Sequence, residues 1–348
     1  MKLKAFLVTF LGVIVLSFFL PHALQANVFT VDMVDPTKKP KIKVSTKDKD
    51  GKVVELDAIV DTGNSDGLYV NQNTATALGL TVGGDQKVRG AGGITTLKKT
   101  NFTGDKALAV QKVDVPMGQA TKTLTISGEG IIGASLPDNT ILLGQTFLSQ
   151  FVQTFNPKTS KLILTALDQL DKKPEVQPKE KPAANKADGK SALNLFEDAT
   201  GPNWVVNMDI ASQTSEFVIG PAYEMSLISE ELALDLGLDL SSLPLVSFPT
   251  YLGDVNVWKI DLPYILFPGD PTAFNGFGVL PNSFNPDFIN ILGSDILGTV
   301  GTYQIDTSEN RLRAGEIVPE PSTIVLSLIG LLGVAFFPLF FNQKSESV

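Results

Sequence analysis

Residues 58–70 read AIVDTGNSDGLYV and place a single acidic residue, Asp61, at the end of an apolar run. Thr62 and Gly63 follow it directly, and the triplet Asp-Thr-Gly is typical of tight turns. An apolar run that stops at such a triplet predicts a strand whose end carries a carboxyl group. The same pattern fits a plain turn or a catalytic carboxylate, so the surrounding sequence decides between them.

Composition narrows the chemistry that the chain can perform. Its 348 residues are enough for two domains, and a net charge of −9 without a long basic cluster argues against a nucleic-acid partner. The chain has no Cys, and its one histidine, His22, lies in an N-terminal segment that is predicted below to be removed. Thiolate catalysis, Cys-ligated zinc and Ser-His or Cys-His nucleophiles are therefore excluded. We expect no cofactor and no metal, and any hydrolysis would rest on carboxylates.

The N-terminus has the layout of a secretory signal. Two lysines precede an apolar run at 5–20, and small residues at Ala23 and Ala26 follow a polar break. We predict a signal peptide at 1–26, cleaved after Ala26, which would also remove His22. An uncleaved membrane anchor is the alternative.

The C-terminus predicts a second membrane-directed segment. Residues 323–341 are apolar and uncharged, long enough for a helix that crosses a bilayer. Val-Pro-Glu-Pro-Ser at 318–322 resembles the PEP-CTERM sorting tail of exported bacterial proteins, which implies processing by an exosortase. An arginine cluster usually ends that tail, whereas only Lys344 follows here. We predict a sorting or transmembrane tail at 317–348 and a protein anchored in the inner membrane, facing the periplasm or cell surface. A plain tail anchor gives the same topology.

Between these ends the chain carries a duplicated unit. Residues 168–191 are rich in Lys, Glu, Pro and Ala and predict a flexible linker. It separates a first lobe, 27–167, from a second lobe, 192–316. The segment 141–164 is repeated in 291–314, and short Val/Ile/Leu-rich runs between turn signals predict a mostly β fold.

Alignment of the two lobes locates the counterpart of the first turn. If Gly79 is set opposite Gly237, no gap is needed back to Asp61, which then falls opposite Ile219. The Phe-, Pro- and Gly-rich segment 267–288 of the second lobe is expected to form a long loop.

Three motifs of the first lobe resemble the pepsin and retropepsin group of aspartic peptidases. They are IVDTGNSDGLYV at 59–70, the Gly-rich VRGAGGITTLK at 88–98 and ILLGQTFL at 141–148. The resemblance implies a two-lobed, β-barrel-like pseudo-dimer with a cleft between the lobes. It assigns a mobile flap to the hairpin around Gly90, Ala91, Gly92 and Gly93, and the catalytic loop to Asp61, Thr62 and Gly63.

In that family each lobe supplies one aspartate, and the pair shares a proton because nearby like charges resist joint ionisation. The threonine braces the loop across the interface. Here the second triplet is replaced by Ile219, Gly220 and Pro221. A solitary Asp61 would lack a like charge to raise its pKa, so we expect it to be ionised near neutrality. Glu224 and Asp295 are poor replacements.

Three functional interpretations remain. The chain is a degenerate peptidase that binds a peptide or protein without cutting it. Alternatively, lobe 1 forms a homodimer, as retropepsins do, which restores two copies of Asp61 and an active endopeptidase. The third interpretation is a non-catalytic surface or matrix-associated scaffold.

Overall fold

The computed structural model describes most of the two predicted lobes. The segments predicted as signal peptide, linker and sorting tail, residues 1–26, 168–191 and 317–348, lie outside the described residues. In the part that the structure describes, no helix is long and apolar enough to cross a membrane. The described residues are 28–64, 67–91, 93–111, 113–114, 123–167, 192–197, 204–210, 213–267, 270–283, 290–307 and 311–314.

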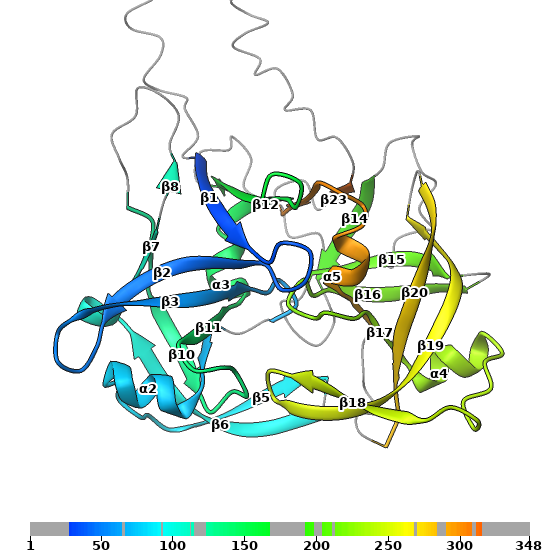
Figure 1. Ribbon diagram of the computed structural model, residues 1–348, viewed down its shortest axis with the longest axis horizontal. Coiled ribbons are helices and arrows are strands. Elements are labelled where there is room, and N and C mark those ends of the chain that lie inside the picture. The colour runs from blue at the N-terminus through cyan, green and yellow to red at the C-terminus, as the bar shows by residue number, and fades with distance from the viewer. Residues whose placement is uncertain are drawn as a thin grey trace, which may run out of the picture. The chain divides into compact units, whose positions relative to one another are not determined.

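The first half of the described chain, residues 28–167, is built almost entirely of short strands (Figure 1). Val, Ile and Leu dominate them, as expected for strands with a buried face. Its elements are β1 (Val28–Val34), β2 (Lys41–Lys47), β3 (Val53–Val60), β4 (Leu68–Val70), α2 (Gln72–Leu78), β5 (Asp85–Gly90), β6 (Gly93–Phe102), η1 (Gly104–Lys106), β7 (Leu108–Val110), β8 (Val113–Asp114), β9 (Thr125–Ile126), β10 (Gly128–Ile132), β11 (Thr140–Leu143), α3 (Gln145–Leu148), β12 (Phe151–Asn156) and β13 (Lys161–Ala166).

The second half, residues 192–314, repeats much of this order, and the prediction of a mostly β chain is confirmed. Its elements are β14 (Ala192–Glu197), β15 (Trp204–Ile210), β16 (Gln213–Ile219), β17 (Leu227–Ser229), α4 (Glu230–Asp235), β18 (Leu245–Thr250), β19 (Gly253–Phe267), β20 (Asp270–Leu280), β21 (Asn290–Leu292), α5 (Ser294–Leu297), β22 (Tyr303–Asp306) and β23 (Arg311–Ala314).

The repeated order extends to the strand pairing. In the first half β11 lies between β3, to which it is parallel, and β4, to which it is antiparallel. In the second half β21 lies in the same way between β16 and β17. A short helix follows β4 and β17, capped by the side chains of Asn71 and Ser229 respectively. The two halves are therefore copies of one unit.

One sheet joins the halves, and β8 pairs with β1 at its first-half edge. β1, β13 and β12 come from the first half, and β22, β23 and β14 come from the second. β12 pairs with β22 across the boundary, and the rings of Phe155 and Tyr303 stack there with centroids 4.7 Å apart. Both halves belong to one compact unit, Met1–Gly315.

Each half also carries a hairpin. β5 pairs with β6, and Gly90 faces Gly93 across the turn, where the predicted flap lies. Gly92 is outside the described residues, and Ala91 is buried. The equivalent hairpin of the second half, β18–β19, was not predicted, and Tyr251 follows its first strand.

The expected long loop at 267–288 is wrong over its first part. β19 and β20 form an antiparallel hairpin in which Phe267 pairs with Asp270. Pro271 pairs with Leu266 of β19, and β20 pairs on its other side with β17 only at Gly278–Leu280. Pro271 therefore lies on an edge stretch of β20, where proline is tolerated.

Candidate functional site

Asp61 follows the last residue of β3 and is fully buried, with 0% of its surface exposed. Its backbone N–H donates to the carbonyl of Leu143 on β11, at 2.9 Å. One carboxyl oxygen, Oδ1, accepts a hydrogen bond from the Gly63 N–H at 3.0 Å. The other, Oδ2, has no hydrogen-bond partner among the described residues. The carboxyl group is thus held in place but only half satisfied.

Burial raises the pKa of Asp61 from its ordinary value of 3.8 to about 7. The low-dielectric surroundings disfavour the charged form, and the backbone N–H groups of Gly63 and Ala222 only partly offset this effect. We expected Asp61 to be ionised near neutrality, whereas with a pKa of about 7 it is about half protonated there. A like charge is not needed to raise this pKa, because desolvation alone is sufficient.

Thr62 and Gly63 fasten the first half to the second. Thr62 Oγ1 donates to the backbone carbonyl of Ile219 at 2.7 Å, and both groups are buried. At Gly63 a Cβ atom would lie 3.1 Å from Gly220 Cα, so no larger residue fits without displacing backbone. Gln145 Nε2, at the start of α3, donates to the Thr62 carbonyl at 2.6 Å and holds the loop in place. The loop that carries Asp61 is also the contact between the halves.

Strand register corrects the second-half counterpart of Asp61 by one residue. Val60 pairs with Leu143, and Ile219 pairs with Leu292. Each of these pairs is the last of its parallel ladder. The next backbone N–H in each half, from Asp61 and Gly220, donates to the carbonyl of Leu143 and Leu292, at 2.9 and 3.0 Å. Gly220, and not Ile219, therefore occupies the position of Asp61.

The misalignment has a simple cause. From Val60 to the helix cap Asn71 the chain advances eleven residues, but from Ile219 to the equivalent cap Ser229 it advances ten. The loop after β16 is one residue shorter, so an ungapped alignment from Gly237 slips by one. The absence of a carboxyl group at this position is unaffected.

Neither alternative acid replaces the missing aspartate. Glu224 is half exposed and pairs with Lys39, with 3.3 Å between Oε1 and Nζ. The Asp295 carboxylate accepts from the N–H of Ser226 at 2.9 Å and from its hydroxyl at 2.7 Å, which fixes the loop before β17. Burial raises the pKa of Asp295 as well. No carboxylate among the described residues contributes to the pKa shift of Asp61.

Three tyrosines pack close to Asp61. Tyr251, in the turn of the β18–β19 hairpin, contacts Tyr69 and Tyr223 edge-on, with ring centroids 5.5 and 6.0 Å apart. Burial raises the pKa of Tyr223 well above 10, and the neighbouring Tyr251 and Asp61 raise it further. All three rings are buried, and they belong to an apolar cluster to which both halves and both hairpins contribute. Sequence reasoning missed these tyrosines because they are far apart in the chain.

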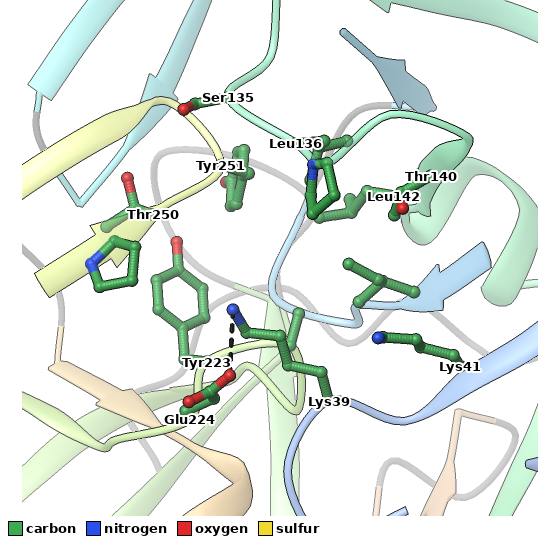
Figure 2. Close-up of a pocket in the computed structure, with 14 residues that line it drawn as sticks. Lys39, Lys41, Ser135, Leu136, Thr140, Leu142, Tyr223, Glu224, Thr250 and Tyr251 are labelled. Atoms are coloured by element: carbon green, nitrogen blue, oxygen red, sulfur yellow. Dashed lines mark ion pairs between the residues drawn. The ribbon is translucent and has the colours of Figure 1, made fainter. Parts of the chain in front are cut away.

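A pocket of about 530 Å³ adjoins this cluster (Figure 2). Lys39 and Lys41 reach into it from the first half, while Tyr223 and Glu224 come from the loop after β16. Asp61 does not line it. The lining residues are Lys39, Lys41, Ile59, Ser135, Leu136, Pro137, Thr140, Leu142, Ala222, Tyr223, Glu224, Pro249, Thr250 and Tyr251. Among the described residues, no group of three or more Asp, Glu or His side chains is placed to hold a metal ion.

Comparison with known proteins gives matches among solved structures only. No family model and no curated protein matches the sequence. A retropepsin-like aspartic protease from Rickettsia conorii is 19% identical, with a TM-score of 0.29 and coverage of 35% of this chain and 96% of that one. Basic 7S globulin from soybean is 12% identical, with a TM-score of 0.44 and coverage of 84% and 95%. Conglutin gamma, a basic 7S globulin from lupine seeds, is 9% identical, with a TM-score of 0.44 and coverage of 83% and 94%.

Proposed function

We propose that this chain is an aspartic-peptidase-like protein without peptidase activity, which binds a peptide or protein segment in the pocket between its halves. The observation that carries the proposal is the glycine at position 220, where strand register places the counterpart of Asp61. With glycine there, Asp61 is the one carboxyl group that the described residues supply at this pair of positions.

The chemistry of peptide hydrolysis explains why one carboxyl group is insufficient. In the family that the motifs resemble, one acid takes a proton from water while its partner protonates or polarises the scissile carbonyl. Asp61 can hold a proton near neutrality, since its pKa is about 7, but the described residues offer no second acid with which it could exchange roles. It is also fully buried, so neither water nor a peptide bond reaches it in this conformation.

The active-homodimer alternative is less favoured. It requires the Asp61 loop of one chain to pair with the same loop of another chain. In this structure that loop is occupied by the second half of its own chain, through the hydrogen bond from Thr62 to Ile219 and the tight packing at Gly63. A homodimer would have to exchange these contacts for equivalent ones between two chains.

Export and membrane sorting form part of the proposal and rest on the sequence of 1–26 and 317–348. In a bacterial host, a full-length chain is expected in the membrane fraction on the periplasmic side. A chain that ends at 316 is expected in the soluble periplasmic fraction. Recovery of both forms in the cytoplasm would contradict the proposed export, while leaving the binding proposal intact.

A peptidase assay tests the loss of catalysis. The full chain, Asp61→Asn and the control Asp254→Asn, an exposed carboxylate on β19, are incubated with an unfolded protein substrate from pH 3 to pH 8, with and without pepstatin. We expect no cleavage by any of the three, and a monomeric mass. Pepstatin-sensitive cleavage that Asp61→Asn abolishes and Asp254→Asn retains would establish the dimeric peptidase instead.

A further inference from the structure

The pocket between the halves has one charged wall. Lys39 and Lys41 both line it, and their side chains are 29% and 24% exposed. Among the described residues that line the pocket, Glu224 is the one carboxylate. The charged groups of the lining itself, two lysines and one glutamate, therefore carry one excess positive charge.

The present partners of both lysines are weakly held. Lys39 pairs with Glu224 at 3.3 Å, and Lys41 pairs with Asp35 at 3.5 Å. Glu224 and Asp35 are 52% and 56% exposed, and ion pairs with such solvent-exposed partners contribute little to stability. A ligand carboxylate can displace either partner at small cost, since the displaced side chain simply returns to water.

The rest of the lining combines apolar side chains with hydroxyl-bearing ones. Ile59, Leu142 and Ala222 line the pocket together with Tyr223, and Thr140 adds a hydroxyl group to the lining. A volume of about 530 Å³ falls within the range of small-ligand sites, which combine apolar walls with a few placed polar groups.

One side of the pocket is closed by a contact between the halves. The Ser135 N–H of the first half donates to the Tyr251 carbonyl in the β18–β19 turn at 2.7 Å, and both residues line the pocket. Figure 2 shows these two residues on the opposite side of the cavity from Lys41. Lys39 lies beside Tyr223 and Glu224, while Lys41 lies apart from Tyr251 (Figure 2). The pocket therefore presents cations and aromatic rings to the same space, which suits a ligand with one anionic end and one apolar end.

We infer that this pocket binds a ligand carboxylate, with Lys41 and Lys39 as the recognising cations and an apolar ligand group against the Tyr223–Tyr251 wall. The inference rests on the proposed peptide-binding function and specifies its chemistry. A peptide can offer a carboxylate from its C-terminus or from an acidic side chain, and the test separates these two sources.

The experiment measures binding of three acetylated peptides to the full chain by isothermal titration. The first is Leu-Leu-Phe with a free carboxylate, the second is the same peptide as an amide, and the third is Leu-Leu-Glu amide. A charge-assisted hydrogen bond contributes roughly 1.5–3 kcal/mol, so we expect the amide of the first peptide to bind about ten-fold or more weakly than the acid. Of the two carboxylate peptides, the tighter binder identifies the source.

Variants assign the effect to the lysines. Lys41→Gln and Lys39→Gln should weaken the carboxylate peptide by about ten-fold or more and leave the amide unchanged. Lys158→Gln, an exposed lysine in the β12–β13 turn, removes the same charge away from the pocket and should change neither. Thermal unfolding of each variant shows whether it is folded.

The outcomes separate the two proposals. Equal binding of acid and amide, or equal loss of both in Lys41→Gln, would overturn the carboxylate inference while peptide binding survives. Absence of binding by all three peptides at millimolar concentration would overturn the inference together with the proposed function.

Discussion

The buried carboxyl group of Asp61 should make the stability of this protein depend on pH in a predictable direction. Its pKa is about 7 in the folded chain and close to 3.8 when it is exposed to water. Below about pH 3 the group is protonated in both states and contributes no pH dependence. As the pH rises towards 7, the unfolded chain releases a proton that the folded chain retains, so the folded state loses stability. Above about pH 8 the loss is nearly complete and constant.

The magnitude follows from the size of the shift. Three pKa units at 1.36 kcal/mol each predict a loss of about 4 kcal/mol in the free energy of unfolding between pH 4 and pH 8. Asp61→Asn removes the titration but keeps an oxygen that can accept from the Gly63 N–H. Its buried amide nitrogen adds a cost that does not vary with pH. The difference between the two proteins should therefore shift by about 4 kcal/mol from pH 4 to pH 8, in favour of the variant.

Urea denaturation at intervals from pH 4 to pH 8, followed by the fluorescence of Trp204 and Trp258, measures this shift. The neighbouring Tyr223 has a pKa well above 10 and stays neutral throughout. Asp295 also has a raised pKa, but it contributes the same slope to both proteins and cancels in the difference. Parallel curves of unfolding free energy against pH for wild type and Asp61→Asn would refute the argument. They would show that the pKa of this carboxyl group is the same in the folded and the unfolded chain.

Three further predictions concern the same region. Thr62→Val removes the hydroxyl that donates to the Ile219 carbonyl of the other half and should lower the free energy of unfolding, measured in urea, by roughly 1–3 kcal/mol. Thr62→Ser keeps the hydroxyl and should keep the stability. Equal stability of the two variants would contradict the role of this hydrogen bond. Gly220→Asp puts a carboxyl group opposite Asp61, but its Cβ would lie 2.9 Å from Ile291 Cγ2. We therefore expect the free energy of unfolding to fall by about 1–3 kcal/mol, and Gly220→Ala to show the same loss. We expect no peptidase activity from Gly220→Asp. Pepstatin-sensitive cleavage by this variant would show that the site lacks only its second acid. Asp295→Ala leaves the buried Ser226 hydroxyl and N–H without their acceptor and should lower the free energy of unfolding by about 1–3 kcal/mol in the same urea assay. Wild-type stability of this variant would mean that other groups accept these two hydrogen bonds.

Local sequence patterns determined a large part of this fold. Alternating and continuous apolar runs bounded by turn residues predicted a mostly β chain, and the repeat predicted two copies of one unit. The strand that ends before Asp61 followed from the same signals, whereas the hairpin around Gly90–Gly93 was implied by the resemblance to aspartic peptidases. Each of these features depends on residues that are neighbours along the chain, so the sequence contains the information directly.

Tertiary structure decided the chemistry of the site. The pKa of Asp61 is raised by burial and partly lowered by the backbone N–H of Ala222 in the second half, and no local pattern reports either effect. The sequence showed that the second aspartate is missing, but only strand register identified Gly220 as the residue in its place. The loop after β16 is one residue shorter than the loop after β3, so an ungapped alignment places Ile219 there instead. The pocket likewise combines Lys41, Tyr223 and Tyr251 from distant segments. Desolvation and register depend on what packs together in space, so the sequence by itself identified the carboxyl group while the folded chain determined its protonation and its partners.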